Sequence, residues 1–218
     1  MFSRKIDANV VYGKKQMTYK SSIQFRFDVK KAAQAAGLIL KLSGGRRNYM
    51  ELIKLLVLTD REALLKLECP VTGDRIFAMR HGLVLARVLD LIKNGPCNEE
   101  DAPWFEIVSA PQGYDVALVN EKCDDDELSG AEIKLLKDVF QQFGRLDWKS
   151  LSRLTHRLPE WSDPGNGSFP VLPEQILRLH GTSETEIARL RDELCAYDQL
   201  DREAMAYRLP DELAPLGE

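Results

Sequence analysis

The side chains that most often carry out catalysis are few in this sequence, and none of them lies in a known catalytic pattern. The three histidines, His81, His156 and His180, stand beside a glycine or near the end of an expected helix. The nucleotide-binding patterns GxxxxGK(S/T) and GxGxxG, the hydrolase pattern GxSxG and the zinc-protease pattern HExxH are all absent. We therefore interpret the histidines as structural or exposed, and we predict that the chain is not an enzyme and needs no cofactor.

Patterns of metal ligands are missing as well. The cysteines have no CxxC pair and no histidine at zinc-site spacing, so we expect small reduced side chains at Cys69, Cys97, Cys123 and Cys195. The acidic run Asp124–Glu127 lacks the glycine and closing glutamate of an EF-hand loop, and it precedes an expected helix start, where the helix dipole favours negative charge. The run Gly44–Arg47 could bind a phosphate, but we favour a turn with an exposed charged pair. We thus predict no metal site.

Composition excludes several other classes of protein. The 218 residues are 44% hydrophobic and 29% charged, with a net charge of −4. These values are typical of a globular protein, and they do not fit a disordered chain, a collagen or a small disulfide scaffold. No apolar stretch approaches the roughly 20 residues that span a bilayer, and no apolar signal segment follows the basic start. We expect a cytoplasmic protein without a membrane partner.

The charge is divided unevenly along the chain. Residues 1–28 carry a local charge of +4, and the remainder carries −8. Such a basic arm, which includes Lys14 and Lys15, could contact phosphate or an acidic partner, although a solvated extension laid over the core is the alternative that we favour. Within the arm, residues 23–27 alternate between apolar and polar, which suits a short strand.

The first half of the remaining chain is mainly helical in pattern. Apolar residues three and four apart predict a helix from Val29 to Leu40, and a second helix from Asn48 to about Leu58 is apolar almost all round, as expected for the centre of a core. Whether this helix continues through the polar residues that follow is left open. Pro70–Asp74 indicates a turn, and after Gly82 a further helix is expected, with Val84, Leu85, Val88, Leu89 and Ile92 on its apolar stripe.

The second half combines one predicted hairpin with strong helix starts. Residues 104–108 and 114–119 are rich in strand formers and predict a β-hairpin. Ser129 with Glu132, and Ser183 with Glu186, form capping boxes, Asp147 is a further cap, and residues 161–173 indicate a loop. We predict a mainly α fold with a basic arm (1–28), a compact helical domain with one small hairpin at about 104–119 (29–161), and a linker with a C-terminal helical extension (162–218).

Five segments in a fixed order resemble a known family. They are Asn48–Glu62, Pro70–Arg75, His81-Gly82, Leu151–His156 and Pro159–Trp161. Their order is similar to that of the Panacea domain, found in antitoxins of bacterial and prophage toxin–antitoxin pairs. The matching positions, here called the motif residues, are Lys54, Leu55, Asp60, Arg61, Thr72, Gly73, Asp74, His81, Gly82, His156 and Trp161. Leu83 stands where the family usually has proline, and Val57 and Thr59 stand where tyrosine and alanine are common.

The motif residues also have structural interpretations of their own. Gly73 suits a positive φ in the turn, and we expect Asp60 and Arg61 to pair with neighbouring groups or with the turn at Asp74. A buried arginine paired in a bidentate manner with a carboxylate would fix the helix against that turn. We favour this fold-defining role over a direct role of the motif residues in partner binding.

The resemblance implies an antitoxin that binds a specific protein toxin, encoded by a neighbouring gene, and blocks it directly. Two alternatives stay open: an adaptor that delivers the toxin to an ATP-dependent protease, and a DNA-binding regulator that uses the basic arm. The net charge of −4 argues against nucleic acid, because such binding rests on phosphate neutralisation. We expect partner contacts outside the motif, at the hairpin around Tyr114, on the C-terminal helix with Arg189 and Tyr197, or on the arm with Lys14 and Lys15.

Overall fold

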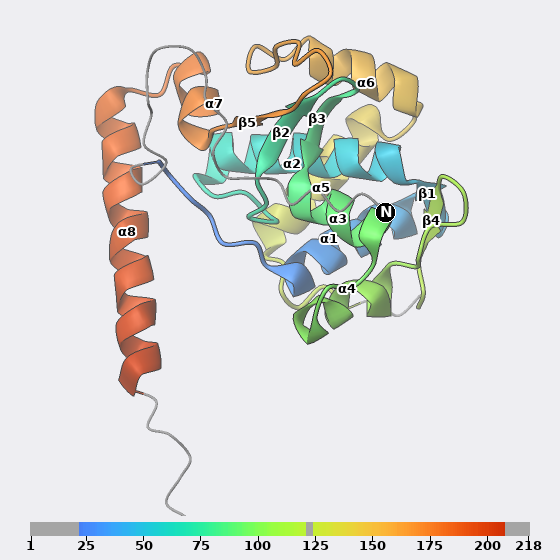
Figure 1. The fold of residues 1–218 in the computed structure, drawn as a ribbon, viewed down its shortest axis with the longest axis horizontal. Helices are drawn as coiled ribbons and strands as arrows, with labels where there is room; N and C mark the ends of the chain where they lie inside the picture. Colours follow the sequence, from blue (N-terminus) through green and yellow to red (C-terminus); the bar gives the residue numbers. More distant parts are fainter. Residues whose placement is uncertain (1–21, 121–123, 208–218) are drawn as a thin grey trace, which may run out of the picture.

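A 19-residue helix, α2 (Tyr49–Leu67), runs through the centre of the structure, a computed structural model that describes residues 22–120 and 124–207 (Figure 1). The predicted helix from Asn48 is confirmed, with Asn48 as its cap, and it continues without a break to Leu67. The polar residues Thr59, Asp60 and Arg61 are all buried, and each has a hydrogen-bond partner. The Thr59 hydroxyl donates to the carbonyl of Leu55 within α2, whereas Asp60 and Arg61 bond groups outside the helix.

Helices dominate the described residues, so the predicted mainly α class is confirmed. Around α2 lie α1 (Val29–Leu42), α3 (Ala86–Asn94), the short 3₁₀ helix η2 (Glu99–Asp101), α4 (Ala102–Ile107), α5 (Gly130–Phe143), α6 (Trp148–His156), α7 (Pro173–Leu179) and α8 (Glu184–Tyr207). Three of the predicted helix starts are confirmed: the capping box of Ser129, the Asp147 cap and the capping box of Ser183. Helices α1, α5, α6 and α7 all contact α2, which therefore forms the middle of the core.

A small antiparallel sheet has the strand order β3-β2-β5 and lies across one side of α2 (Figure 1). Its strands are β2 (Ile76–Met79), β3 (Gly82–Leu85) and β5 (Phe169–Val171). The helix predicted directly after Gly82 is therefore wrong in its first turn, because Val84 and Leu85 belong to β3 and α3 begins at Ala86. All four residues of β3 are buried, and a short apolar run has the same appearance in a buried strand as in a buried helix.

The predicted hairpin at residues 104–119 is wrong in its first half. Residues 102–107 form α4, and Trp104 is completely buried on this helix, which packs against α1. The second half is extended as predicted, but β4 (Asp115–Ala117) pairs mainly with β1 (Arg46–Asn48). Between the two segments that were expected to pair, 104–108 and 114–119, the structure has a single antiparallel bridge, from Val108 to Leu118. Burial of the tryptophan against α1 has overridden the local preference for a strand.

The start of the described chain is extended but forms no strand over residues 23–27, contrary to the expected pattern. The backbone N–H of Asp28 donates to the carbonyl of Thr72 at 3.1 Å, and the N–H of Ile23 donates to a carboxylate oxygen of Glu174 in α7. This segment is therefore held by a turn and a side chain instead of a sheet. The rest of the basic arm, with Lys14 and Lys15, lies outside the described residues.

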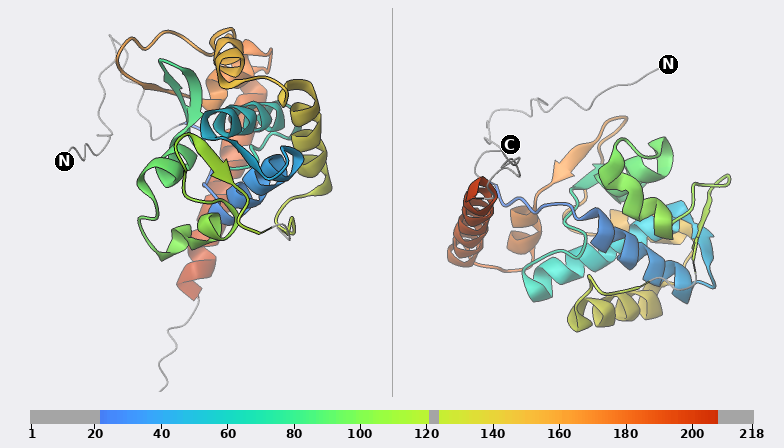
Figure 2. Two further views of the ribbon diagram at one scale, coloured as in Figure 1. Left: turned by 90° about the vertical axis from the view of Figure 1, so that its right-hand side faces the viewer. Right: turned by 90° about the horizontal axis from the view of Figure 1, so that it is seen from below.

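Helix α8 begins against the core and then leaves it (Figure 1; Figure 2). The predicted C-terminal helical extension packs only through the first half of α8, where Ile187 and Leu190 are buried, whereas Tyr197 is 68% exposed and Leu200 60% exposed. The predicted loop before it also contributes β5 to the sheet, so this part of the chain is joined to the core by backbone hydrogen bonds. Within the described residues no helix is long and apolar enough to cross a membrane.

Candidate functional site

A buried chain of hydrogen bonds ties α2 to the turn at residues 70–74. The Asp60 side chain, 1% exposed, accepts from the backbone N–H of Thr72 at 2.9 Å and from the Thr72 hydroxyl. That hydroxyl in turn accepts from the N–H of Asp74 at 3.1 Å. Burial raises the pKa of Asp60 to about 7, against the opposing effect of the two Thr72 donors. The expected contact between Asp60 and the turn is therefore present, through Thr72.

Asp74 connects the same turn to α3. Its carboxylate accepts from the backbone N–H groups of Arg75 at 2.7 Å, Arg87 at 3.1 Å and Val88 at 3.0 Å. The last two belong to the first turn of α3, whose own cap residue, Leu85, offers no side-chain hydrogen bond. Asp74 thus caps α3 from a distant position in the sequence. Burial raises its pKa, while the three backbone donors act in the opposite direction.

Arg61 pairs with the neighbouring Glu62 at 3.0 Å, as one of the two expectations had it, and it also makes a buried ion pair that was not expected. Its Nε donates to Glu160 at 2.5 Å, and the Glu160 side chain is completely buried. A second nitrogen of the guanidinium contacts Nε2 of His180 at the end of α7. Because arginine can only donate, Nε2 of His180 is the acceptor in this contact. The pair therefore joins α2 to the segment after α6 and to α7, and not to the turn at Asp74.

Lys54 is the second buried cation of α2. Its side chain is 0% exposed, and Nζ donates to the carbonyl of Leu83 in β3 at 2.6 Å. Gly82 makes this approach possible, because a Cβ at that position would lie 2.0 Å from Oγ1 of Thr155 and 3.3 Å from Nζ of Lys54. Burial lowers the pKa of Lys54 to about 7. Together these residues fix β3 against α2 and α6.

The lowered pKa predicts a pH-dependent effect of Lys54→Met on stability. Between pH 7 and the ordinary lysine value of 10.5, the unfolded chain binds a proton at Lys54 that the folded chain does not. The free energy of unfolding of the wild type therefore gains, relative to the variant, at most about 1.4 kcal/mol per pH unit across this range. Urea unfolding from pH 6 to 10 measures the difference, with Lys137→Met on exposed α5 as the control. A difference that does not change with pH would contradict the prediction.

The two late motif residues meet beneath the turn between β2 and β3. The rings of His156 and Trp161 lie 4.2 Å apart, and Nε1 of Trp161 donates to the carbonyl of Met79 at 3.3 Å. Burial lowers the pKa of His156 below its usual value, and its Nε2 is buried without a protein hydrogen bond. His81, by contrast, is exposed, and its ring meets the ring of Trp148 edge-on at 6.1 Å.

Most motif residues thus hold the fold together. Leu55 lies in the core, and Gly73 has a φ of +67° with its backbone against Arg26. Motif residues take part in four contacts: α2 with the turn, α2 with Glu160, α2 with β3, and His156 with Trp161. Among the motif residues only His81 is exposed. Sequence reasoning missed the roles of Glu160 and His180, because nothing local marks them as partners of Arg61. No group of three or more metal-ligating side chains occurs in residues 22–120 and 124–207.

A groove with a volume of about 780 Å³ opens on the surface beside His81. We call it the aromatic groove, and it is lined by Asn48, Tyr49, Met50, Met79, Arg80, His81, Val84, Leu89, Lys93, Tyr114, Trp148, Gly165, Asn166 and Gly167. Tyr114, singled out from the sequence, stacks on Tyr49 with 6.0 Å between ring centres and is 69% exposed. The groove is thus formed by segments that are distant in the sequence.

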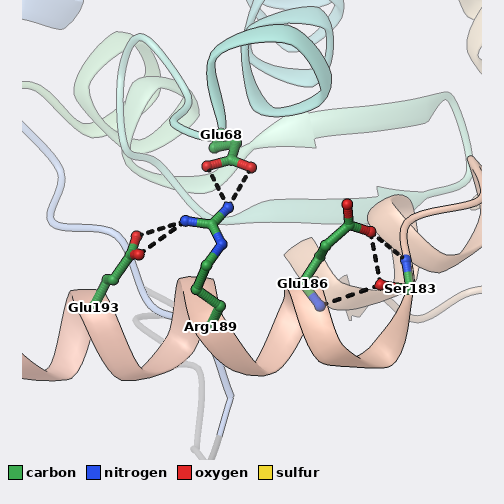
Figure 3. Close-up of polar contacts among 5 residues, drawn as sticks. All are labelled: Glu68, Ser183, Glu186, Arg189 and Glu193. Carbon is green, nitrogen blue, oxygen red and sulfur yellow. Dashed lines mark hydrogen bonds and ion pairs between the residues drawn. The ribbon is translucent and has the colours of Figure 1, made fainter.

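The other residues singled out on the surface lie on α8, away from this groove. The guanidinium of Arg189 bonds both carboxylate oxygens of Glu68 at 2.6 and 2.8 Å and both of Glu193 at 2.9 Å (Figure 3). These carboxylates raise the pKa of Arg189. Glu68 ends α2 with a φ of +59°, so the pair fastens α8 to the end of the central helix. Tyr197 lies on the exposed second half of α8.

The comparison with protein families gives a match over the segment that contains the motif residues. The family model described as "Antitoxin SocA-like, Panacea domain" matches residues 52–162, about half of the chain. The chain belongs to this family. No curated protein and no solved structure matches it. All eleven motif residues fall within the matched range of the Panacea domain.

Segments outside the matched range complete the contacts of the Panacea domain. His180, which contacts Arg61, and Arg26, which packs against Gly73, both lie beyond it. Leu83, which departs from the family pattern, pairs with Ala78 in the β2–β3 ladder and offers its carbonyl to Lys54. The Panacea domain of this protein is therefore folded together with its flanking segments.

Proposed function

We propose that this protein is the antitoxin of a bacterial or prophage toxin–antitoxin pair and that it neutralises its toxin in the cytoplasm by direct binding, without catalysis. The observation that carries the proposal is the match of the Panacea antitoxin domain over residues 52–162. A family match of this kind indicates the type of partner, a toxin, and leaves its chemical class open.

The internal bonding of the motif supports binding as the mode of action. Five polar motif residues form hydrogen bonds with other groups inside the protein: Lys54, Asp60, Arg61, Thr72 and Asp74. Catalysis would require such groups to face a substrate, whereas a binding protein requires a rigid surface that is held in shape from within. We therefore assign the toxin contact to the surface of the fold.

Co-expression with the neighbouring open reading frame tests the proposal. We expect the product of that frame to arrest growth when it is expressed alone, and we expect co-expression of this chain to restore colony counts and to yield a co-purified complex. The proposal would be contradicted if the product of the neighbouring frame does not arrest growth. It would also be contradicted if this chain neither restores growth nor co-purifies with that product.

The same experiment separates direct binding from delivery to a protease. Under direct binding, rescue of growth is unchanged in strains that lack the ATP-dependent proteases, and toxin levels stay constant when this chain is expressed. Under delivery, rescue is lost in one of these strains and the toxin accumulates there. An immunoblot of the toxin in each strain supplies the second measurement.

A further inference from the structure

We propose that the aromatic groove is the surface that binds the toxin, and that its occupant is an acidic segment with apolar side chains. The inference rests on the proposed function and extends it by naming the surface and the chemistry of the partner. It combines three properties of the groove: its charge, its exposed apolar side chains and its rigidity.

The charge of the groove is positive although the chain as a whole is negative. Arg80 and Lys93 line it, and none of its lining residues is an aspartate or glutamate. Lys149 adds a further cation, with Nζ 5.8 Å from the centre of the Trp148 ring. In a chain with a net charge of −4, such a local excess favours association with negatively charged groups.

Two of the carboxylates beside the groove are already paired with arginines. Asp115, next to Tyr114, lies 3.2 Å from Nε of Arg46, and Glu51, on the first turn of α2, lies 3.1 Å from Nε of Arg47. The charges within each pair neutralise each other, so neither Asp115 nor Glu51 is available to compensate Arg80 or Lys93. Asp147 and Asp163, which also stand close in sequence to lining residues, accept backbone N–H groups. A partner that brings its own carboxylates would supply the compensation.

The apolar part of the groove consists of side chains that dominate protein interfaces. Tyr114 is 69% exposed and Trp148 is 37% exposed, while Met50 and Met79 contribute flexible apolar surface. Tyrosine, tryptophan and arginine are the residues that most often carry the binding energy of protein interfaces. The volume of about 780 Å³ lies within the usual range for binding cavities and is large enough to receive several side chains.

The walls of the groove are fixed by hydrogen bonds from the elements behind it. The N–H of Tyr49 donates to the carbonyl of Tyr114 at 2.8 Å, and the N–H of Trp148 donates to Glu51 at 3.0 Å. The carbonyl of His81 accepts from Ser152 of α6 at 2.8 Å. A partner would therefore meet a surface that is already in shape, which reduces the entropic cost of binding.

Other occupants fit the groove less well. The basic arm of the same chain carries +4 and would be repelled. A nucleic acid would meet only two arginine or lysine side chains in the lining, and the aliphatic side chains of Val84 and Leu89 provide no charge for its phosphates. An acidic segment with apolar side chains uses both the cations and the apolar lining.

Charge reversal in the groove tests the proposal with the toxin as the probe. We expect Arg80→Glu/Lys93→Glu to reduce the amount of co-purified toxin at least tenfold and to abolish rescue of growth, and Tyr114→Ala to reduce both. Lys137→Glu on α5 and Tyr197→Ala on α8 are the matched controls outside the groove, and each should behave as the wild type. Circular dichroism and the urea midpoint establish that every variant is folded.

A crosslinker placed in the groove identifies the occupant directly. With benzoylphenylalanine at position 114, irradiation of cells that express both proteins should give a crosslink to the toxin, and the same residue at position 197 should give none. Normal rescue by the folded double variant would overturn the inference, and so would a crosslink from position 114 to nucleic acid or to a second copy of this chain. In either case, rescue by the wild type would still support the antitoxin function. Failure of the wild type to rescue would overturn both.

Discussion

Replacing Gly73 by alanine is expected to destabilise the fold by at least about 3 kcal/mol, more than half of the lower limit of typical domain stability. Gly73 has a φ of +67°, where a residue with a Cβ is strained, and a Cβ would lie 2.1 Å from the carbonyl oxygen of Arg26. Because that atom belongs to the backbone, the segment before α1 would have to move. The hydrogen bond from Asp28 to Thr72 would then be lost. Urea unfolding measures the cost.

Gly44→Ala is the matched control for the Gly73 variant. Gly44 has a φ of +80°, but no atom lies within 4 Å of a Cβ built there. The control therefore carries the backbone strain alone, for which we expect about 1 kcal/mol. Limited proteolysis of the segment before α1 provides a second measurement, since cleavage should become faster in the Gly73 variant only. Equal costs for the two variants would show that the close approach of Arg26 contributes nothing.

The second large effect is expected for Arg61→Met, which leaves Glu160 buried without its partner. The Glu160 side chain is 0% exposed and that of Arg61 is 8% exposed, so solvent cannot replace the lost interaction. Breaking a buried pair from one side costs about 3–5 kcal/mol, because an uncompensated charge remains in the interior. The loss should appear as a lower urea midpoint.

A double variant distinguishes the value of the pair from the cost of an orphaned charge. Arg61→Met/Glu160→Leu should recover most of the stability, since a buried pair and an apolar replacement of similar volume are often equivalent. Arg189→Met is the exposed control: its side chain is 46% exposed, it bonds Glu68, and its loss should cost much less than that of Arg61 because solvent screens the pair. A cost for Arg61→Met as small as that for Arg189→Met would contradict the prediction.

Local signals in the sequence determined where most helices begin and end. Ser129 and Glu132, Asp147, and Gly95 after α3 act within a few residues of the backbone groups that they satisfy. The glycine of the Pro70–Asp74 turn likewise permits the positive φ that Gly73 adopts. The resemblance to the Panacea domain follows from such segments, and the family match confirms it. These features depend on neighbours in the chain, so they can be predicted from sequence alone.

The tertiary structure decided the pairings between distant residues. Arg61 selects Glu160, and not the turn at Asp74, because the segment after α6 folds back over α2. Residues 104–107 become helical because burial of Trp104 against α1 outweighs a local strand preference. The aromatic groove joins Tyr49, Tyr114 and Trp148, which are far apart in the sequence. Periodicity shows that a residue is buried or exposed, whereas the neighbour it contacts depends on how the whole chain packs.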